Sequence, residues 1–204
     1  MRGEHQARPL QADQRVAYPI DAIGPYGEHP GGLAAQVDRV RDALVGLERP
    51  RLVFTAHSIP VTMAQTSPYE RQLRSACAHV AAAVGIADWE LAWQSRSGAP
   101  QVPWLEPDVL VALERLAAEP AERARPVVLV PIGFTSDHME VVWDLDHEAR
   151  QKADALGLTL VRAGTVGTHP LFVRALLDIV GAWRNAPVTL TTCGPSCCPA
   201  PRRP

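Results

Sequence analysis

The sequence predicts an α/β fold in which a parallel sheet of about four strands is flanked by helices. Two observations predict this class. From about residue 34 onward, short apolar runs alternate with amphipathic stretches of helical length. In addition, PVVLVPIGF at 126–134 is a long apolar run rich in β-branched residues, which is typical of a strand buried between two helix layers.

Each apolar run gives a strand, and the amphipathic stretches between the runs give helices. The expected strands are 51–56, 89–94, 126–134 and 158–164. The expected helices are 34–48, 67–85, 107–118, 134–149 and 170–184. Because parallel strands all end at the same edge of a sheet, catalytic and binding residues gather at that carboxyl edge. The segments AHSIP and GFTSDH both follow strands there.

Composition suggests three parts and excludes one class of partner. Residues 1–33, rich in Pro, Gly and charge, are expected to form an irregular N-terminal segment, 34–187 the α/β domain, and 188–204 a Cys- and Pro-rich tail. The 204 residues are 47% hydrophobic, enough for a sizeable core. The formal net charge of −2 gives no electrostatic reason to expect a nucleic-acid partner.

The chain carries no signal for membrane insertion or export. No apolar run reaches the length that spans a bilayer. The first residues, MRGEHQARPLQADQR, lack the apolar centre of a secretory signal. We therefore expect a cytoplasmic protein.

A row of carboxylates marks the segment FTSDHMEVVWDLDHEA at 134–149. On a helical wheel Asp137, Glu140, Asp144 and Glu148 lie on one face. An acidic, solvated surface is the ordinary interpretation. We expect the row to lack basic partners at i,i+4, however, and Asp144 and Glu148 lie beyond the first turn, where the helix dipole favours acids. Such a row suits the passage of a cation, since each carboxylate offers oxygen ligands.

His57 is the first candidate for catalysis because it directly follows the strand at 51–56. A neutral imidazole can accept a proton or bind a transition metal, although a structural histidine is the alternative. His138 is a weaker candidate, since it should project toward the apolar side of its helix. The later segment LAWQSRSGAPQVPWLEPD suggests either a flat apolar pocket lined through Trp93, Gln94 and Ser95 or a core tryptophan pair beneath a loop.

Three cysteines, Cys193, Cys197 and Cys198, lie within the tail segment CGPSCCP. Their spacing is not the paired C-x2-C of most zinc sites, and an iron–sulfur cluster normally needs four ligands. Cys77 lies on the apolar face of an expected helix, where a buried inert thiol is expected. The residues alone leave open a cluster or an unstructured tail with incidental thiols.

Taken together and in this order, VFTAHSIP, LAWQSRSG, PWLEPD and PIGFTSDHMEVVWDLDHEA resemble the C-terminal half of ferrochelatases. The resemblance covers about residues 18–185 and includes PYGEHPGGL at 25–33. It implies a chelatase-type, Rossmann-like half-domain. It also implies a lyase of heme biosynthesis that inserts ferrous iron, its substrate, into a porphyrin, either coproporphyrin III, as in similar actinobacterial enzymes, or protoporphyrin IX.

The resemblance also assigns roles to individual residues. It implies that His57 and Glu140 are catalytic and face the metal from opposite sides of the porphyrin. Asp144 and Glu148 would continue as metal ligands along a widened helix toward the surface. Ser58, Trp93, Gln94 and Ser95 would belong to the porphyrin pocket. Finally, Cys193, Cys197 and Cys198 resemble the C-terminal ligands of a [2Fe–2S] cluster, which would be incomplete in this chain.

The chain departs from the family in length, because the preceding half-domain of ferrochelatases is nearly absent. We therefore expect a truncated ferrochelatase that self-associates through an exposed half-domain face. Two alternatives stay open at this stage. One is a cobalt- or nickel-type tetrapyrrole chelatase, whose single-domain size fits the chain. The other is an inactive porphyrin- or iron–sulfur-binding fragment.

Overall fold

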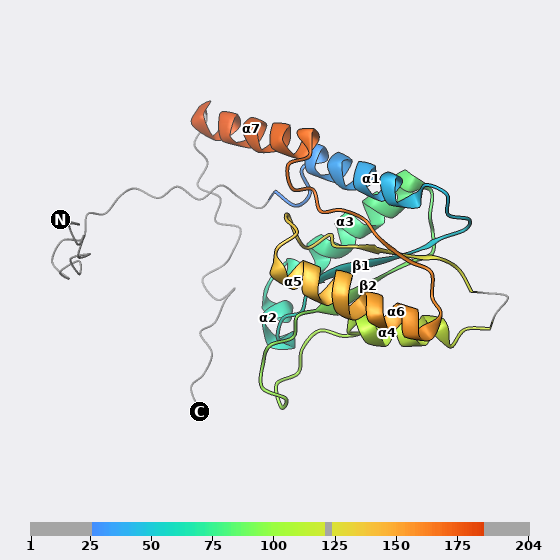
Figure 1. The fold of residues 1–204 in the computed structure, drawn as a ribbon. Helices are drawn as coiled ribbons and strands as arrows, with labels where there is room; N and C mark the ends of the chain where they lie inside the picture. Colours follow the sequence, from blue (N-terminus) through green and yellow to red (C-terminus); the bar gives the residue numbers. More distant parts are fainter. Residues whose placement is uncertain (1–25, 121–123, 186–204) are drawn as a thin grey trace, which may run out of the picture.

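Four parallel strands form the centre of the structure, a computed structural model that describes residues 26–120 and 124–185 (Figure 1). The strands are β1 (Arg51–His57), β2 (Trp89–Gln94), β3 (Val127–Val130) and β4 (Leu160–Arg162). Their order in the sheet is β2-β1-β3-β4. Because β1 and β3 are buried along most of their length, the sheet is covered on both faces, as the sequence predicts.

Helices cover the sheet in two layers. One layer holds α1 (Pro30–Leu44) and α3 (Tyr69–Val84), and α7 (Pro170–Asn185) packs on α1. The other layer holds α4 (Val109–Ala117) and a continuous helical run made of α5 (Met139–Val141), the π-helix η2 (Val142–Ala149) and α6 (Arg150–Leu156). The short α2 (Val61–Thr66) follows β1. No helix among the described residues is long and apolar enough to cross a membrane.

The alternation of side chains along the strands builds two cores. Phe54 of β1 packs with Val40 and Val80 beneath α1 and α3, whereas its neighbour Val53 packs with Leu113 and Leu145 beneath α4 and η2. All six side chains are buried. Successive residues of a strand point to opposite faces, so one strand serves both cores.

Several element boundaries differ from the expected ones. The helix expected at 34–48 begins at Pro30 and ends at Leu44, so the last residues of the expected irregular segment 1–33 are helical. Proline suits the first helical position, and the His29 ring accepts a hydrogen bond from the Gly31 amide at 3.2 Å. The strand expected at 126–134 ends at Val130, because Pro131 has no amide hydrogen to continue the ladder.

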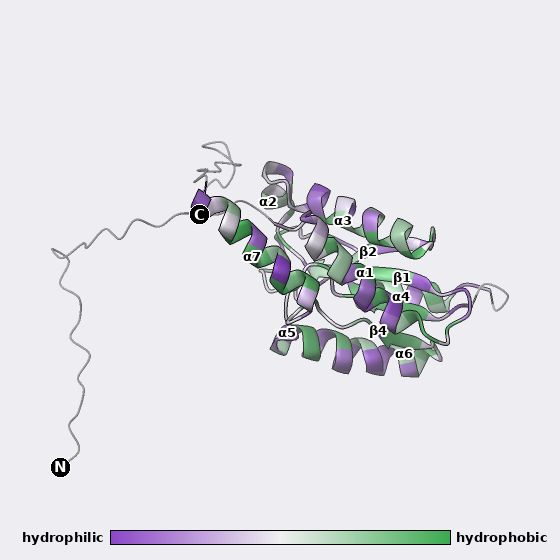
Figure 2. Cartoon of the chain, turned by 90° about the horizontal axis from the view of Figure 1, so that it is seen from above, coloured by the Kyte–Doolittle hydropathy of each residue, from purple (hydrophilic) through white to green (hydrophobic). Residues whose placement is uncertain are grey.

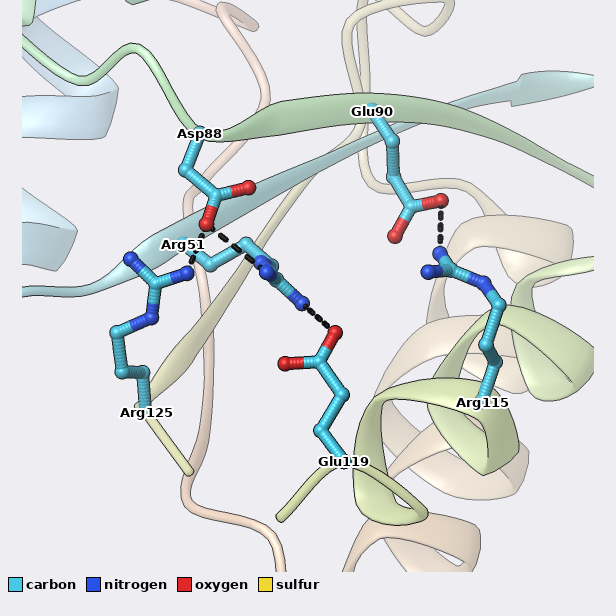
Figure 3. A network of polar contacts seen from close by, with 6 residues as sticks. All are labelled: Arg51, Asp88, Glu90, Arg115, Glu119 and Arg125. Carbon is cyan, nitrogen blue, oxygen red and sulfur yellow. Dashed lines mark hydrogen bonds and ion pairs between the residues drawn. The ribbon is translucent and has the colours of Figure 1, made fainter. Parts of the chain in front are cut away.

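A network of ion pairs holds the amino edge of the sheet, opposite the edge where the strands end (Figure 3). Arg51, the first residue of β1, binds Asp88 at 2.9 Å and Glu119 at 2.7 Å. Arg125, just before β3, also binds Asp88. Burial acts to raise the pKa of Asp88, but its hydrogen bonds to the two arginines lower the pKa overall. These contacts join the starts of three strands and leave the carboxyl edge to the candidate site.

Candidate active site

The ends of β1 and β2 bring the first candidate residues together. The two strands are parallel neighbours, and His57 at the end of β1 is paired in register with Gln94 at the end of β2. The chain continues from them into Ser58 and Ser95, and the Ser58 amide donates a hydrogen bond to the Gln94 carbonyl at 2.8 Å. Residues that are 37 positions apart in the sequence therefore lie side by side at one edge.

The imidazole of His57 presents one free nitrogen. Its Nδ1 lies 2.5 Å from the carbonyl oxygen of Ser58, which can only accept a hydrogen bond. In the neutral ring Nδ1 must therefore carry the hydrogen, and Nε2 keeps its lone pair. The hydroxyl of Tyr69 donates to the His57 carbonyl at 3.0 Å, and burial raises the pKa of Tyr69 to about 12, which keeps this donor protonated. A neutral imidazole held in this way can accept a proton or bind a metal through Nε2.

Gln94 and Ser95 bind the carboxylate of Asp144. The Gln94 amide Nε2 donates to Asp144 Oδ2 at 3.1 Å, and the Ser95 hydroxyl donates to the same oxygen. Ser95 has a φ of 60°, in the left-handed region that few residues other than glycine adopt. Gln94 is buried, and its Oε1 has no hydrogen-bond partner among the residues that the structure describes. The contacts connect the end of β2 to the helical run on the neighbouring layer.

The row of carboxylates runs along a helical run whose middle segment, Val142–Ala149, is a π-helix. Glu140 is in α5, and Asp144 and Glu148 are in the π-helix η2. Glu140 and Glu148 are exposed, whereas Asp144 is half-buried. π-Helical segments are rare and are frequent at functional sites. The wide helix that the family resemblance implies is therefore present at the expected place.

A polar pocket of about 240 Å³ lies between the end of β2, the start of α4 and η2. Its polar lining includes Gln94, Ser95, Asp108, Asp144 and Glu148. Asp108 reaches the pocket because the Trp93 amide donates to the Pro107 carbonyl at 2.9 Å, which holds this segment along β2. Three carboxylates therefore line one small pocket, together with Arg96.

An apolar pocket of about 300 Å³ lies in the helix layer opposite α4 and η2, between α1, α3 and the segment that follows β3. Its aromatic walls include Tyr26, Tyr69, Phe134 and Phe172. Because the Tyr69 hydroxyl also binds the His57 carbonyl, this apolar surface adjoins the candidate histidine. The carboxyl edge thus combines an apolar, aromatic surface with a polar pocket.

Comparison with known proteins identifies the family. The family model described as Ferrochelatase matches residues 4–182, most of the chain. The chain belongs to the ferrochelatase family. It is 42% identical over 210 residues to a coproporphyrin III ferrochelatase of Propionibacterium freudenreichii, covering 95% of this chain and 59% of the relative. It is 48% identical over 156 residues to a ferrochelatase of Rhodopirellula baltica, covering 74% of this chain and 44% of the relative.

The chain spans about half the length of the ferrochelatases that it matches. Among solved structures, a multi-domain protein of Deinococcus radiodurans with structural similarity to chelatases matches with a TM-score of 0.52. That match has 24% sequence identity and covers 76% of this chain and 30% of the other protein. At this identity the likeness supports the chelatase-like α/β fold alone, which confirms the fold class expected from the sequence.

Ser58 and Trp93, which the ferrochelatase resemblance assigns to the porphyrin pocket, have buried side chains in this structure. Ser58 is 2% exposed, and its hydroxyl donates to the Leu105 carbonyl at 2.9 Å. Trp93 is 1% exposed and packs in the core beneath α1 and α3, with its ring beside that of Tyr69. Both side chains therefore pack within the fold next to the strand ends.

Asp137 stands apart from the acidic row, whereas Glu148 remains part of it. Asp137 precedes the helix and forms an ion pair with Arg162 at 2.8 Å, so it does not share the environment of the other acids. Lys152 stands four residues after Glu148, a basic position that the sequence interpretation overlooked. Its Nζ binds Glu114 at 2.5 Å instead. The row is therefore Glu140, Asp144 and Glu148, none of which forms an ion pair among the described residues.

The structure shows where His138 lies, but the tail cysteines are outside the residues that it describes. His138 was expected on the apolar side of a helix, but it precedes α5, is exposed, and packs edge-on against Phe134 with ring centroids 5.3 Å apart. Cys193, Cys197 and Cys198 lie outside the described residues. Within 26–120 and 124–185 there is no group of three or more His, Cys, Asp or Glu side chains that could hold a metal ion, so the carboxylates form no closed cage.

The sequence interpretation did not single out Asp108. Its surroundings in the structure predict that its ionisation makes stability depend on pH. Its Oδ1 accepts the Leu110 amide at 2.8 Å as the N-cap of α4. Burial, followed by the charges of Asp144 and Glu148, raises the pKa of Asp108. A carboxyl whose pKa is raised by folding is protonated more readily in the folded state, so stability falls as pH rises from the unfolded pKa through the folded pKa.

Asp108→Asn is therefore expected to stabilise the protein at pH 7, by about 0.5 kcal/mol, because asparagine keeps the cap and removes the like-charge contacts. The difference should vanish at a pH below the unfolded pKa of aspartate, where both chains are neutral at this position. Urea unfolding across this pH range measures it. Asp154→Asn, at an exposed position of α6, is the control. A constant difference at all pH values would contradict the electrostatic origin.

Proposed function

We propose that this chain carries the metal-insertion site of a ferrochelatase and inserts ferrous iron into coproporphyrin III. The observation that carries the proposal is the meeting of two unlike groups at one sheet edge. A histidine with a free Nε2 ends β1, and beside it Gln94 and Ser95 hold a carboxylate of the acidic π-helix. Coproporphyrin III is chosen because the relatives named for that substrate match 88–95% of this chain.

The reaction needs a base and a path for the ion. Metal insertion replaces two pyrrole N–H protons of the porphyrin with a divalent cation. In the proposal Nε2 of His57 accepts a pyrrole proton or presents the metal, since Nδ1 is the nitrogen that binds the Ser58 carbonyl. The exposed carboxylate of Glu140 acts from the other side of the ring. Asp144 and Glu148 replace water ligands of the iron along the π-helix.

The apolar pocket supports the binding of a flat macrocycle next to His57. Tyr69 forms part of its wall and also holds the backbone of His57. Aromatic side chains favour offset stacking on flat, conjugated ligands. Gln94 and Ser95 are assigned to the edge of the ligand site, with Ser58 and Trp93 supporting it from within the fold. A [2Fe–2S] cluster at Cys193, Cys197 and Cys198 stays part of the proposal on the basis of their sequence alone.

The decisive experiment is an anaerobic insertion assay with the purified chain. Insertion of Fe²⁺, or of Zn²⁺ as a redox-stable substitute, into coproporphyrin III is expected and is followed by the change in the porphyrin absorption spectrum. Protoporphyrin IX is the matched substrate control. Insertion of Co²⁺ or Ni²⁺ alone would favour the alternative tetrapyrrole chelatase. Porphyrin binding with no insertion of any metal would favour a binding fragment.

We also propose that copies of the chain associate through α7. This helix packs on α1 through Phe172 and Ala175, but its other side carries exposed apolar residues and extends beyond the sheet and its layers (Figures 1 and 2). The exposed apolar residues are Leu171, Val173, Leu176, Leu177 and Val180, and all but Leu171 share one face of the helix. A contiguous apolar helix face of this kind is typical of an interaction surface. Sedimentation velocity at several concentrations tests for a dimer, and a monomer at all of them would contradict it.

A further inference from the structure

Arg162, the last residue of β4, binds the helical run that carries the acidic row. Its guanidinium binds both carboxylate oxygens of Asp146, through Nε at 2.5 Å and through Nη2 at 2.9 Å. Its Nη1 binds Asp137 at 2.8 Å and the carbonyl of Ala163 at 3.2 Å. Only 16% of the Arg162 side chain is exposed. Two parallel hydrogen bonds to one carboxylate fix direction as well as distance, which a single charge contact does not.

The two contacts of the π-helix lie on opposite sides of it. Asp146, which Arg162 holds, and Asp144, which Gln94 and Ser95 hold, are two residues apart, and such residues point to roughly opposite sides of a helix. The strands that hold them are also at opposite edges, because the sheet order is β2-β1-β3-β4. The helix is therefore fastened to the ends of both edge strands.

We propose that Arg162 is a positioning residue that sets the rotation of η2 about its own axis, and so directs Asp144 and Glu148 into the polar pocket. It does this through Asp137 and Asp146, and it touches neither the metal nor the porphyrin. Release of Asp146 removes the contact between η2 itself and the end of β4, and leaves only the hydrogen bond from Arg150, after η2, to the Leu160 carbonyl on that side. The π-helix can then rewind toward the commoner α-helical hydrogen-bond pattern, which changes the angle between Asp144 and Glu148. This inference rests on the proposed function.

The test compares metal and porphyrin kinetics in variants of the full chain. Arg162→Gln is expected to raise the KM for Zn²⁺ by about tenfold, a typical loss for changes just outside a metal site, while the KM for coproporphyrin III stays within about twofold. Arg162→Lys should lie between the parent and Arg162→Gln, because lysine keeps the charge but cannot form the two-pronged contact. A general loss of folding would instead affect both substrates.

Two further variants isolate the contact. Asp146→Asn should raise the KM for Zn²⁺ in the same way, and the double variant with Arg162→Gln should be no worse than either single variant, since both remove one interaction. Arg150→Gln is the matched control, because Arg150 joins the same helical run to β4 through the Leu160 carbonyl at 2.5 Å and contacts no carboxylate of the row.

Zn²⁺ affinity measured by calorimetry, without turnover, gives a second readout. If Arg162→Gln does not fold, as judged by circular dichroism, Arg162→Lys and Asp146→Asn carry the test. An unchanged Zn²⁺ affinity and KM in folded variants would overturn the role of Arg162 while leaving the proposed function standing. A parent chain that neither binds nor inserts Zn²⁺ would overturn the proposed function, and this inference with it.

Discussion

His57→Ala is expected to slow metal insertion by at least about 100-fold while porphyrin affinity changes little. The substitution removes the free Nε2, the one nitrogen of this ring that no backbone group occupies. It leaves the main-chain contacts in place, including the Tyr69 hydroxyl on the carbonyl of residue 57. Initial rates of Zn²⁺ insertion into coproporphyrin III measure turnover, and quenching of intrinsic tryptophan fluorescence measures porphyrin binding.

His79→Ala provides the matched control, because His79 is an exposed residue of α3. Its rate of insertion should equal that of the parent. Added imidazole should restore part of the activity of His57→Ala if the missing group acts as a base. Undiminished turnover by His57→Ala would remove this histidine from the reaction.

Gly133→Ala should lower the free energy of unfolding by about 2 kcal/mol and also impair insertion. Gly133 lies in the segment after β3, where its amide donates to the Thr55 carbonyl at 3.1 Å. A Cβ atom at this position would lie 2.5 Å from the Cβ of Ala56 and 2.8 Å from its Cα, both of which belong to the strand that ends at His57. Backbone atoms of a central strand cannot move aside, so the added methyl must push the segment away.

Gly181→Ala is the control for the same chemical change. Nothing lies within 4 Å of a Cβ at Gly181, which is in α7. Alanine is favoured over glycine in helices, so this variant should be more stable than the parent by up to about 1 kcal/mol. Chemical denaturation of both variants provides the comparison. Equal stability of Gly133→Ala and the parent would show that the segment after β3 has room to adjust.

The strands and long helices were predictable because their patterns are local. The β-branched run gave β3, and the amphipathic stretches gave α1, α3, α4 and α7 within a few residues. The six residues of α2 have no buried side chain, so no apolar periodicity marks them. A helix was expected at 134–149, whereas the helical run extends from Met139 to Leu156, and its π-helical hydrogen bonds leave no trace in apolar spacing. The widening was expected only through the family resemblance.

The sequence singled out individual residues of the candidate site, but it did not predict which of them lie next to one another. His57 and the acids stood out through their position after strands and their spacing. Their neighbours did not, because neighbourhood depends on strand order. Asp108 reads in sequence as a helix cap, and only the pairing of its segment with β2 brings it to Asp144. The role of Arg162 was also not predictable from the sequence, because only the fold brings this residue of β4 to Asp146.

The two outer strands are poor templates for further strands. One end of β2 is occupied on its open side by the Pro107–Asp108 segment, and Glu90 in its middle pairs with Arg115 of α4. At the other edge, β4 has only three residues. Short or covered edges prevent sheets from growing by addition of another chain. Any assembly of this protein should therefore be built from helices, strengthened by salts that favour apolar burial, and free of the cross-strand pairing that leads to fibres.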